Sequence, residues 1–242
     1  MTHEILQLMQ QLRLSGMRAI YEGILSSKNN QSIDNDQLLN LLLQAEWEER
    51  ENQKANRRLA NAHFRFKASL EEIDFVTPRG INKTQLLRFA DACFVNKAEN
   101  VLVTGPTGVG KSHIATALGY VACQHGYTVN YFVAQKLFST LRMSKADESY
   151  QKIIKRIERQ DLIIIDDFGM QPLDDLSRMA LLEIIQDRHQ VRSTIIASQL
   201  PIDKWYEVIG ENTVADSILD RLVHTSHRVD LTGESMRKKK KI

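Results

Sequence analysis

Residues 105–112 are the segment of this chain whose residue types and spacing most clearly specify a chemistry. They read Gly-Pro-Thr-Gly-Val-Gly-Lys-Ser and fit the pattern G-x-x-x-x-G-K-[ST] at every defined position. The three glycines let the backbone take positive φ, so that successive N–H groups can point at one anion. Lys111 is predicted to reach the β- and γ-phosphates of a nucleotide, and the Ser112 hydroxyl to ligate Mg²⁺. The alternative is a glycine-rich turn that carries a lysine by chance.

The residues on either side of this segment supply the structural context that the pattern requires. Val101–Thr104 have strand character, and residues 113–123 read as a helix. The N-terminus of that helix directs partial positive charge at the same anion. The predicted ligand is ATP, and the predicted contacts to it are Gly105, Pro106, Thr107, Gly108, Val109, Gly110, Lys111, Ser112 and His113.

A second candidate feature is a pair of acids at the end of an apolar strand. Residues 162–165 read Leu-Ile-Ile-Ile, and Asp166 and Asp167 follow directly. Burying like charges is unfavourable unless a cation compensates them, so the pair indicates a bound metal ion. Asp166 is predicted to hold Mg²⁺ through water, and Asp167 to orient and polarise the attacking water. Two solvated loop carboxylates are the alternative.

Composition and charge set broad limits on the kind of protein. The chain has 242 residues, a formal net charge of +2 and 43% hydrophobic residues, which is typical of a soluble globular protein. Cys93 and Cys123 lack metal-site spacing and are expected to be reduced, partly buried thiols. No apolar run approaches 18 residues and the N-terminus lacks a signal-peptide pattern, so we expect no membrane association and a cytoplasmic location.

The elements that must position these residues follow from the periodicity. Residues 1–68 show helical stripes of apolar residues and predict a small helical module for binding a partner or DNA; a break at 26–36 divides it. A composition shift near 69–80 places the second domain at 69–242. There, strands at 100–104, 127–132, 161–165, 193–197 and 226–230 alternate with helices at 83–93, 111–125, 134–143, 147–160, 175–190 and 214–223. This pattern predicts an α/β fold with a five-stranded parallel sheet sandwiched by helices.

Several segments together resemble the IstB-like insertion-sequence ATP-binding proteins, within the IstB/DnaC-type family of AAA+ ATPases. The resemblance covers nearly the whole chain and is carried by residues 103–119, 162–173, 199–205, 218–224 and 231–240. In AAA+ proteins the second acid is usually glutamate, and Asp167 is one methylene shorter. The shorter acid leaves nucleotide binding intact but makes a nucleotide-gated protein with little turnover an alternative.

The resemblance also implies roles for three further residues. Gln199 or Ser198 matches the position that contacts the γ-phosphate or the lytic water, although a turn at the strand end is an equal alternative. Arg221 matches the arginine finger that acts on a neighbouring subunit's nucleotide, and an ordinary ion pair with Asp220 or Asp216 is its alternative. Arg237 resembles a second phosphate-sensing arginine. The chain ends five residues later, so the helical lid that usually follows is expected to be absent.

Two basic runs are candidate DNA contacts. On one helix, Lys54, Arg58 and Arg65 would fall at i, i+4 and i+11, a stripe suited to following a phosphate backbone without reading sequence. A second run lies before the paired acids and comprises Lys152, Lys155, Arg156 and Arg159. Taken alone, a basic run of this kind more commonly marks the solvent-exposed face of a helix.

The family resemblance implies an ATP-dependent homo-oligomer on duplex DNA, largely without sequence preference, that assists a partner transposase. A replicative helicase loader of the same family is the principal alternative. A small-molecule kinase is a third interpretation, but kinases of this size generally carry an arginine-rich lid, and paired acids favour activation of water.

Overall fold

A computed structural model describes residues 2–26, 34–146, 148–224 and 226–236. These residues divide into two compact units, Met1–Arg57 and Arg58–Ile242. The division falls earlier than the predicted boundary at residue 68. The reason is packing, because Ala62 and Ala68 are buried in the core of the second unit.

The first unit is helical, as the stripes predicted. It contains α1 (Thr2–Gln11), α2 (Ser15–Ser26) and most of α3 (Asn35–Asn61). The Glu46 carboxylate of α3 accepts hydrogen bonds from the backbone N–H groups of Gly16, at 3.0 Å, and Met17, at 3.3 Å. These N–H groups lie in the first turn of α2 and have no partner within that helix, so Glu46 satisfies them and ties α2 to α3.

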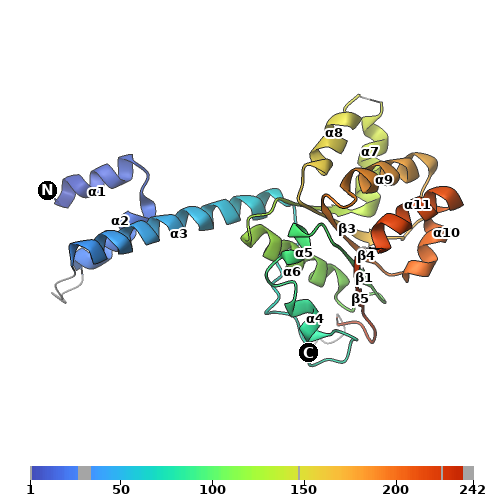
Figure 1. Ribbon diagram of the computed structural model, residues 1–242, viewed down its shortest axis with the longest axis horizontal. Helices are drawn as coiled ribbons and strands as arrows, with labels where there is room; N and C mark the ends of the chain where they lie inside the picture. Colours follow the sequence, from blue (N-terminus) through green and yellow to red (C-terminus); the bar gives the residue numbers. More distant parts are fainter. Residues whose placement is uncertain (1, 27–33, 147, 225, 237–242) are drawn as a thin grey trace. The chain divides into compact units, whose positions relative to one another are not determined.

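The second unit is built on a five-stranded parallel sheet, as predicted (Figure 1). The strands are β1 (Asn100–Thr104), β2 (Val129–Val133), β3 (Leu162–Phe168), β4 (Ser193–Ser198) and β5 (Ser226–Asp230). Their order across the sheet is β2-β3-β4-β1-β5, and every neighbouring pair is parallel. β1 and β3 therefore both end at the same edge of the sheet, with β4 between them. This edge is where the two predicted motifs meet.

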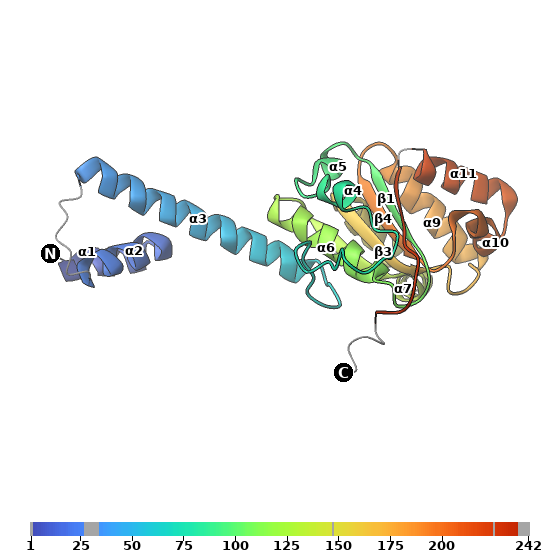
Figure 2. The ribbon, with the colours of Figure 1, turned by 90° about the horizontal axis from the view of Figure 1, so that it is seen from below.

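Helices cover both faces of the sheet (Figures 1 and 2). Side chains alternate along each strand, so that Val101 and Val103 pack into one hydrophobic cluster and Leu102 into the other. The first face is covered by α4 (Lys83–Leu87), α5 (Cys93–Asn96) and α6 (Lys111–Gln124). The second is covered by α7 (Ala134–Ser144), α8 (Tyr150–Glu158), α9 (Asp175–Arg188), α10 (Trp205–Ile209) and α11 (Asn212–Val223).

Two details of the second unit differ from the sequence-based expectations. The single helix expected at 83–93 is interrupted, because Ala92 adopts a left-handed conformation with φ 54° and α5 begins after it. A 3-10 helix (Ile202–Lys204) leads into α10, and neither was predicted. Trp205, the first residue of α10, is fully buried against Phe168. Tertiary packing therefore stabilises this short helix, which is too short to show a helical repeat of apolar residues in the sequence.

Both units contain helices, but none of the described helices is long and apolar enough to cross a membrane.

Candidate nucleotide site

The phosphate-loop segment connects β1 to α6 and contains three glycines with positive φ, the first of which, Gly105, has φ 141°. Gly108 has φ 83° and Gly110, the residue immediately before α6, has φ 108°. A side chain at Gly108 would overlap the side chain of Ser235. Lys111 is only 7% exposed, and its Nζ donates a 2.7 Å hydrogen bond to the Pro106 carbonyl. The loop therefore curls around the lysine ammonium, an arrangement suited to binding an anion.

The paired acids at the end of β3 meet this loop. The Ser112 hydroxyl donates a 3.0 Å hydrogen bond to Asp166 Oδ1, and the Asp167 N–H donates to the same oxygen at 2.9 Å. The Tyr131 hydroxyl donates to Asp166 Oδ2. Asp166 is 1% exposed, so its carboxylate is buried and fixed by three donors. Burial and the hydrogen bond to Asp166 raise the pKa of Tyr131 well above its ordinary value, which keeps the phenol a donor.

Asp167 leaves the regular strand geometry. Its φ is 57°, and the β3–β4 pairing shifts register between Ile165 and Phe168. An irregularity of this kind re-aims a side chain at the end of a strand. The Asp167 carboxylate reaches the same cavity as Lys111, and its Oδ2 lies 3.4 Å from Arg65 Nη1.

Gln199 joins the cavity from the end of β4, whereas Ser198 does not. Thr107 Oγ1 donates a 2.6 Å hydrogen bond to Gln199 Oε1, which ties the strand end to the phosphate loop. Ser198 is fully buried and its hydroxyl donates to the Phe168 carbonyl at 2.7 Å. Of the two residues that the sequence left open, Gln199 is the one that faces the phosphate loop.

The cavity formed by these elements has a volume of about 410 Å³. It is lined by Arg65, Phe66, Thr107, Gly108, Gly110, Lys111, Ser112, His113, Asp167, Gln199 and Met236. All of these residues belong to the second unit. Most of the residues predicted for phosphate binding therefore share one cavity with Asp167, whereas Gly105, Pro106 and Val109 do not line it.

The donor atoms near Ser112 fit a magnesium ion. Mg²⁺ prefers hard oxygen ligands and usually binds through one or two carboxylates, waters and substrate phosphates. Ser112 Oγ and Asp166 Oδ1 are oxygens of this kind and lie 3.0 Å apart. No group of three or more His, Cys, Asp or Glu side chains suited to a metal occurs among the described residues, so waters and phosphates would supply the further ligands of an ion here.

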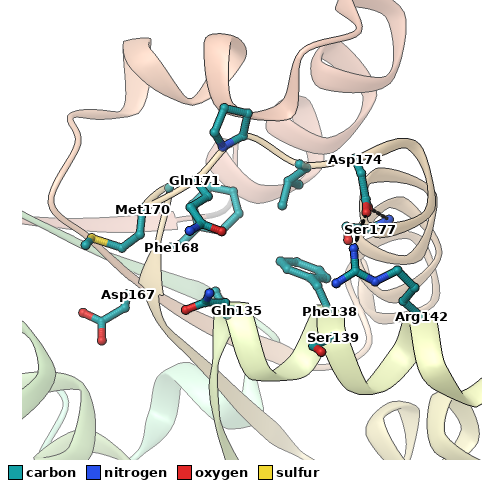
Figure 3. Close-up of a pocket in the computed structure, with 14 residues that line it drawn as sticks. Gln135, Phe138, Ser139, Arg142, Asp167, Phe168, Met170, Gln171, Asp174 and Ser177 are labelled. Atoms are coloured by element: carbon teal, nitrogen blue, oxygen red, sulfur yellow. Dashed lines mark hydrogen bonds and ion pairs between the residues drawn. The ribbon is translucent and has the colours of Figure 1, made fainter.

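A second cavity lies on the other side of the β3 end, between α7 and the segment that leads to α9 (Figure 3). Gln135, Phe138 and Gln171 line it, and the Arg142–Asp174 ion pair, at 2.8 Å, lies at its edge. The Asp167 carboxylate points away from Phe138 in this view. None of the residues predicted to contact the nucleotide lines this second cavity.

One family of known proteins matches nearly the whole chain. Residues 7–242 match the family described as IstB-like ATP binding protein. The chain belongs to this family. An insertion-sequence ATP-binding protein of Sinorhizobium fredii is 37% identical over 238 residues, which cover 98% of this chain and 97% of that protein. Another, of Mycobacterium tuberculosis, is 31% identical, and the match covers 95% of this chain and 92% of that protein.

Solved structures resemble about two thirds of this chain in fold. The DnaC helicase loader superposes with a TM-score of 0.55 at 20% identity, over 68% of this chain and 96% of that one. DnaI superposes with a TM-score of 0.60 at 20% identity, over 69% of this chain and 92% of the DnaI chain. Family membership makes the chain an ATP-binding protein, and these two structures share its fold.

Arg221 does not line the cavity of its own chain. It lies near the end of α11, where its Nη1 donates to the carbonyl, at 2.7 Å, and the hydroxyl, at 2.6 Å, of Ser217. The Arg221 carbonyl accepts a 3.4 Å hydrogen bond from Asn100 Nδ2, at the start of β1. The phosphate loop follows the opposite end of that strand. Neither Asp216 nor Asp220 forms an ion pair with Arg221 among the contacts of the described residues, so the simple ion-pair alternative lacks a partner there.

The first predicted DNA stripe is interrupted in the structure. Lys54 and Arg58 lie one turn apart on α3, and Lys54 pairs with Glu51 at 2.7 Å. Arg65 does not continue their stripe, because α3 ends at Asn61 and His63 has φ 58°. The prediction of one continuous helical stripe was therefore wrong at Arg65, which faces Asp167 instead.

The second predicted DNA run does lie together. Lys152, Lys155, Arg156 and Arg159 line one groove along α8, with Glu148, Gln151 and Gln160. Ile154 and Ile157 on the opposite side of this helix are buried in the core. The structure thus presents four basic side chains on one outward face.

Arg237 lies outside the described residues. The residues just before it reach the phosphate loop, since the Met236 N–H donates a 2.9 Å hydrogen bond to the Gly108 carbonyl.

Sequence reasoning missed Arg79. Its side chain is 5% exposed, and Nη1 donates a 2.7 Å hydrogen bond to the Val109 carbonyl in the phosphate loop. Nη2 donates to the Asp74 carbonyl, and the Thr232 N–H donates to the Arg79 carbonyl at 2.8 Å. Arg79 thereby joins the phosphate loop to two distant segments. No short motif contains it, so nothing in the local sequence indicated this role.

Proposed function

We propose that this protein hydrolyses ATP with Mg²⁺, assembles as a homo-oligomer on duplex DNA, and assists a transposase. The observation that carries the proposal is the convergence of Lys111, Ser112, Asp167 and Gln199 on one cavity beside the buried Asp166. A nucleotide with a terminal phosphate would use all of these groups.

Each residue has a role that its position supports. Lys111 exchanges the Pro106 carbonyl for the β- and γ-phosphates, while the N–H groups of the loop bind the same phosphates. Ser112 and Asp166 hold Mg²⁺, Asp166 through water; when bound, the ion supplies positive charge that neutralises the phosphates. Gln199 contacts the γ-phosphate or the attacking water, because its amide already lies against Thr107 of the loop.

Asp167 orients and polarises the attacking water. Its carboxylate reaches the cavity from the irregular end of β3, next to the fixed Asp166. The water oxygen bonds to the γ-phosphorus and the water gives one proton to the Asp167 carboxylate, from which it passes to solvent. The bond from that phosphorus to the bridging oxygen breaks, so that inorganic phosphate leaves and ADP keeps the electron pair.

Arg221 completes the site of a neighbouring subunit. Its place on α11, away from the cavity of its own chain, supports a role in trans and therefore a homo-oligomer. Such an arginine stabilises charge that develops in the transition state. We assign DNA contact to the groove along α8, with Lys54 and Arg58 of α3 as a second contact.

The transposase is the preferred partner because insertion-sequence proteins are similar over nearly the whole chain, whereas the helicase loaders are similar in fold alone. The test of the ATPase proposal is phosphate release with and without duplex DNA. Turnover that requires a small-molecule acceptor and ignores DNA would indicate a kinase instead. Co-purification with the transposase, compared with the replicative helicase, tests the partner.

A further inference from the structure

Arg65 lies at the mouth of the nucleotide cavity, although it belongs to neither nucleotide motif. Its side chain is 56% exposed and lines the same cavity as Lys111 and Ser112. The only carboxylate paired with it among the described contacts is Asp167, at 3.4 Å. The Arg65 guanidinium therefore lines the same cavity as Lys111 of the phosphate loop and Asp167, the acid proposed to activate water.

The backbone that carries Arg65 is anchored on both sides. Before it, the Tyr131 N–H of β2 donates a 2.8 Å hydrogen bond to the Ala62 carbonyl. Phe64 packs on Tyr120 of α6, with ring centroids 4.8 Å apart. After it, Phe66 stacks on His113, the third residue of α6, with centroids 6.1 Å apart. Arg65 therefore points out from a segment held against β2 and the start of α6.

The Arg65–Asp167 pair is poorly suited to be a permanent link. It is long and half-exposed, and exposed ion pairs of this kind contribute little to stability. The terminal phosphate of ATP offers several acceptor oxygens and more negative charge than one carboxylate. A guanidinium binds such a group with two parallel hydrogen bonds. ATP in this cavity would compete with Asp167 for Arg65.

We propose that Arg65 binds the terminal phosphate of ATP held in its own subunit and gives up Asp167 to do so. Arg65 then distinguishes ATP from ADP, because ADP lacks the terminal phosphate that Arg65 would bind. The inference rests on the proposed function, because it requires ATP in this cavity.

The test measures the affinity of the full-length protein for a non-hydrolysable ATP analogue and for ADP, each with Mg²⁺, by titration calorimetry. Arg65→Ala should weaken binding of the ATP analogue about tenfold, the loss expected for one charge-assisted contact, and change ADP binding less than about twofold. Arg65→Lys should retain part of the preference for the ATP analogue, since charge remains without the two-donor geometry. Lys67→Ala is the matched control, because it removes a positive charge two residues away that does not line the cavity.

An unchanged ratio of the two affinities in Arg65→Ala would overturn the inference, and so would an equal loss for both nucleotides. Circular dichroism and the melting temperature of each variant separate a loss of contact from a loss of fold. If the wild-type protein binds and hydrolyses ATP while Arg65→Ala keeps the wild-type ratio, this inference alone fails. If the wild-type protein binds neither nucleotide, the proposed function fails with it.

Discussion

The Ser112 hydroxyl donates a 3.0 Å hydrogen bond to Asp166 Oδ1, although 54 positions separate the two residues in the chain. Ser112 lies at the start of α6 and Asp166 in β3, so the contact joins the phosphate loop to the end of a strand two places away in the sheet. The same two oxygens are the protein groups that we propose hold Mg²⁺, Ser112 directly and Asp166 through water.

Lys111→Ala should weaken ATP binding about 10- to 100-fold, because the phosphates lose their principal side-chain cation. Titration of the variant with a fluorescent ATP analogue measures this loss. ATP-dependent assembly of the Lys111→Ala protein on its own should disappear in parallel, whereas its subunits can still join assemblies of ATP-binding subunits. Wild-type affinity in a folded Lys111→Ala protein would contradict the assignment of the cavity.

Asp167→Asn should bind ATP but turn over about 10²- to 10⁴-fold more slowly, since it loses the carboxylate that orients water while Asp166 remains. Steady-state phosphate release and nucleotide binding on the same preparation separate the two effects. The assembled, ATP-bound state should accumulate. Turnover at the wild-type rate would show that Asp167 does not act on water.

Arg221→Ala should leave ATP affinity of the monomer near wild type and lower turnover of the oligomer about 10³-fold, by analogy with other arginine fingers. Mixing it with Lys111→Ala provides the decisive measurement. The Lys111 variant supplies an intact Arg221 to a neighbour that retains an intact cavity, so mixed assemblies should recover part of the activity. Demonstrated co-assembly without recovery would argue against a role in trans.

DNA binding should weaken with rising salt, with a slope of roughly −0.9 in log K per phosphate contacted. Replacing Lys152, Lys155, Arg156 and Arg159 with alanine should reduce that slope by up to about 3.6 and weaken all sequences about equally. The buried Ile154 and Ile157 are unchanged in this variant, so α8 should stay folded. Fluorescence anisotropy with labelled duplexes measures both quantities.

The matched comparison for DNA binding is Lys54→Ala combined with Arg58→Ala on α3. Arg65 is left out of this variant because it lines the nucleotide cavity and would confuse ATP effects with DNA effects. If the salt slope changed only in the α3 variant, the main DNA contact would lie on α3 and not on α8.

The two cysteines should differ in reactivity. Burial raises the pKa of Cys123 to about 12, so at pH 8 only about 10⁻⁴ of that thiol is ionised. Cys93 is exposed, contrary to the expectation of a partly buried thiol, although its hydrogen bond to Asp91 also raises its pKa. Mass spectrometry after timed iodoacetamide treatment should show modification of one thiol, Cys93, before modification of the second. Cys93→Ser should remove that fast event, and rapid labelling of the remaining Cys123 would contradict its burial.

Much of the fold and the core of the candidate site could be predicted from local sequence. The phosphate loop depends on backbone freedom at glycines within eight residues, and Gly108 and Gly110 have the positive φ that the pattern implied. The apolar run that ends at Asp166 predicted β3 because a strand buried on both faces needs continuous apolar residues. β1 was predicted with its observed bounds for the same reason. These features depend on short-range geometry, which neighbouring residues determine.

Other features depended on contacts between distant segments. The helical periodicity continued through Arg65, yet α3 ends at Asn61, because Phe64 packs on Tyr120 and the Ala62 carbonyl binds the Tyr131 N–H. Nothing within the helix sequence could show that this packing outweighs a few further helical hydrogen bonds. The choice of Gln199 over Ser198 required the positions of Thr107 and Phe168 in space.

The sequence by itself determined that the chain holds a phosphate loop, paired acids and a parallel sheet, since each follows from residue types a few positions apart. Only the tertiary structure decided that Arg65 faces Asp167, that Arg79 supports the phosphate loop, and that Arg221 lies away from the cavity of its own chain. The physical reason is that local patterns specify backbone geometry and side-chain periodicity, whereas the partner of a long, charged side chain depends on which distant segments the core brings beside it.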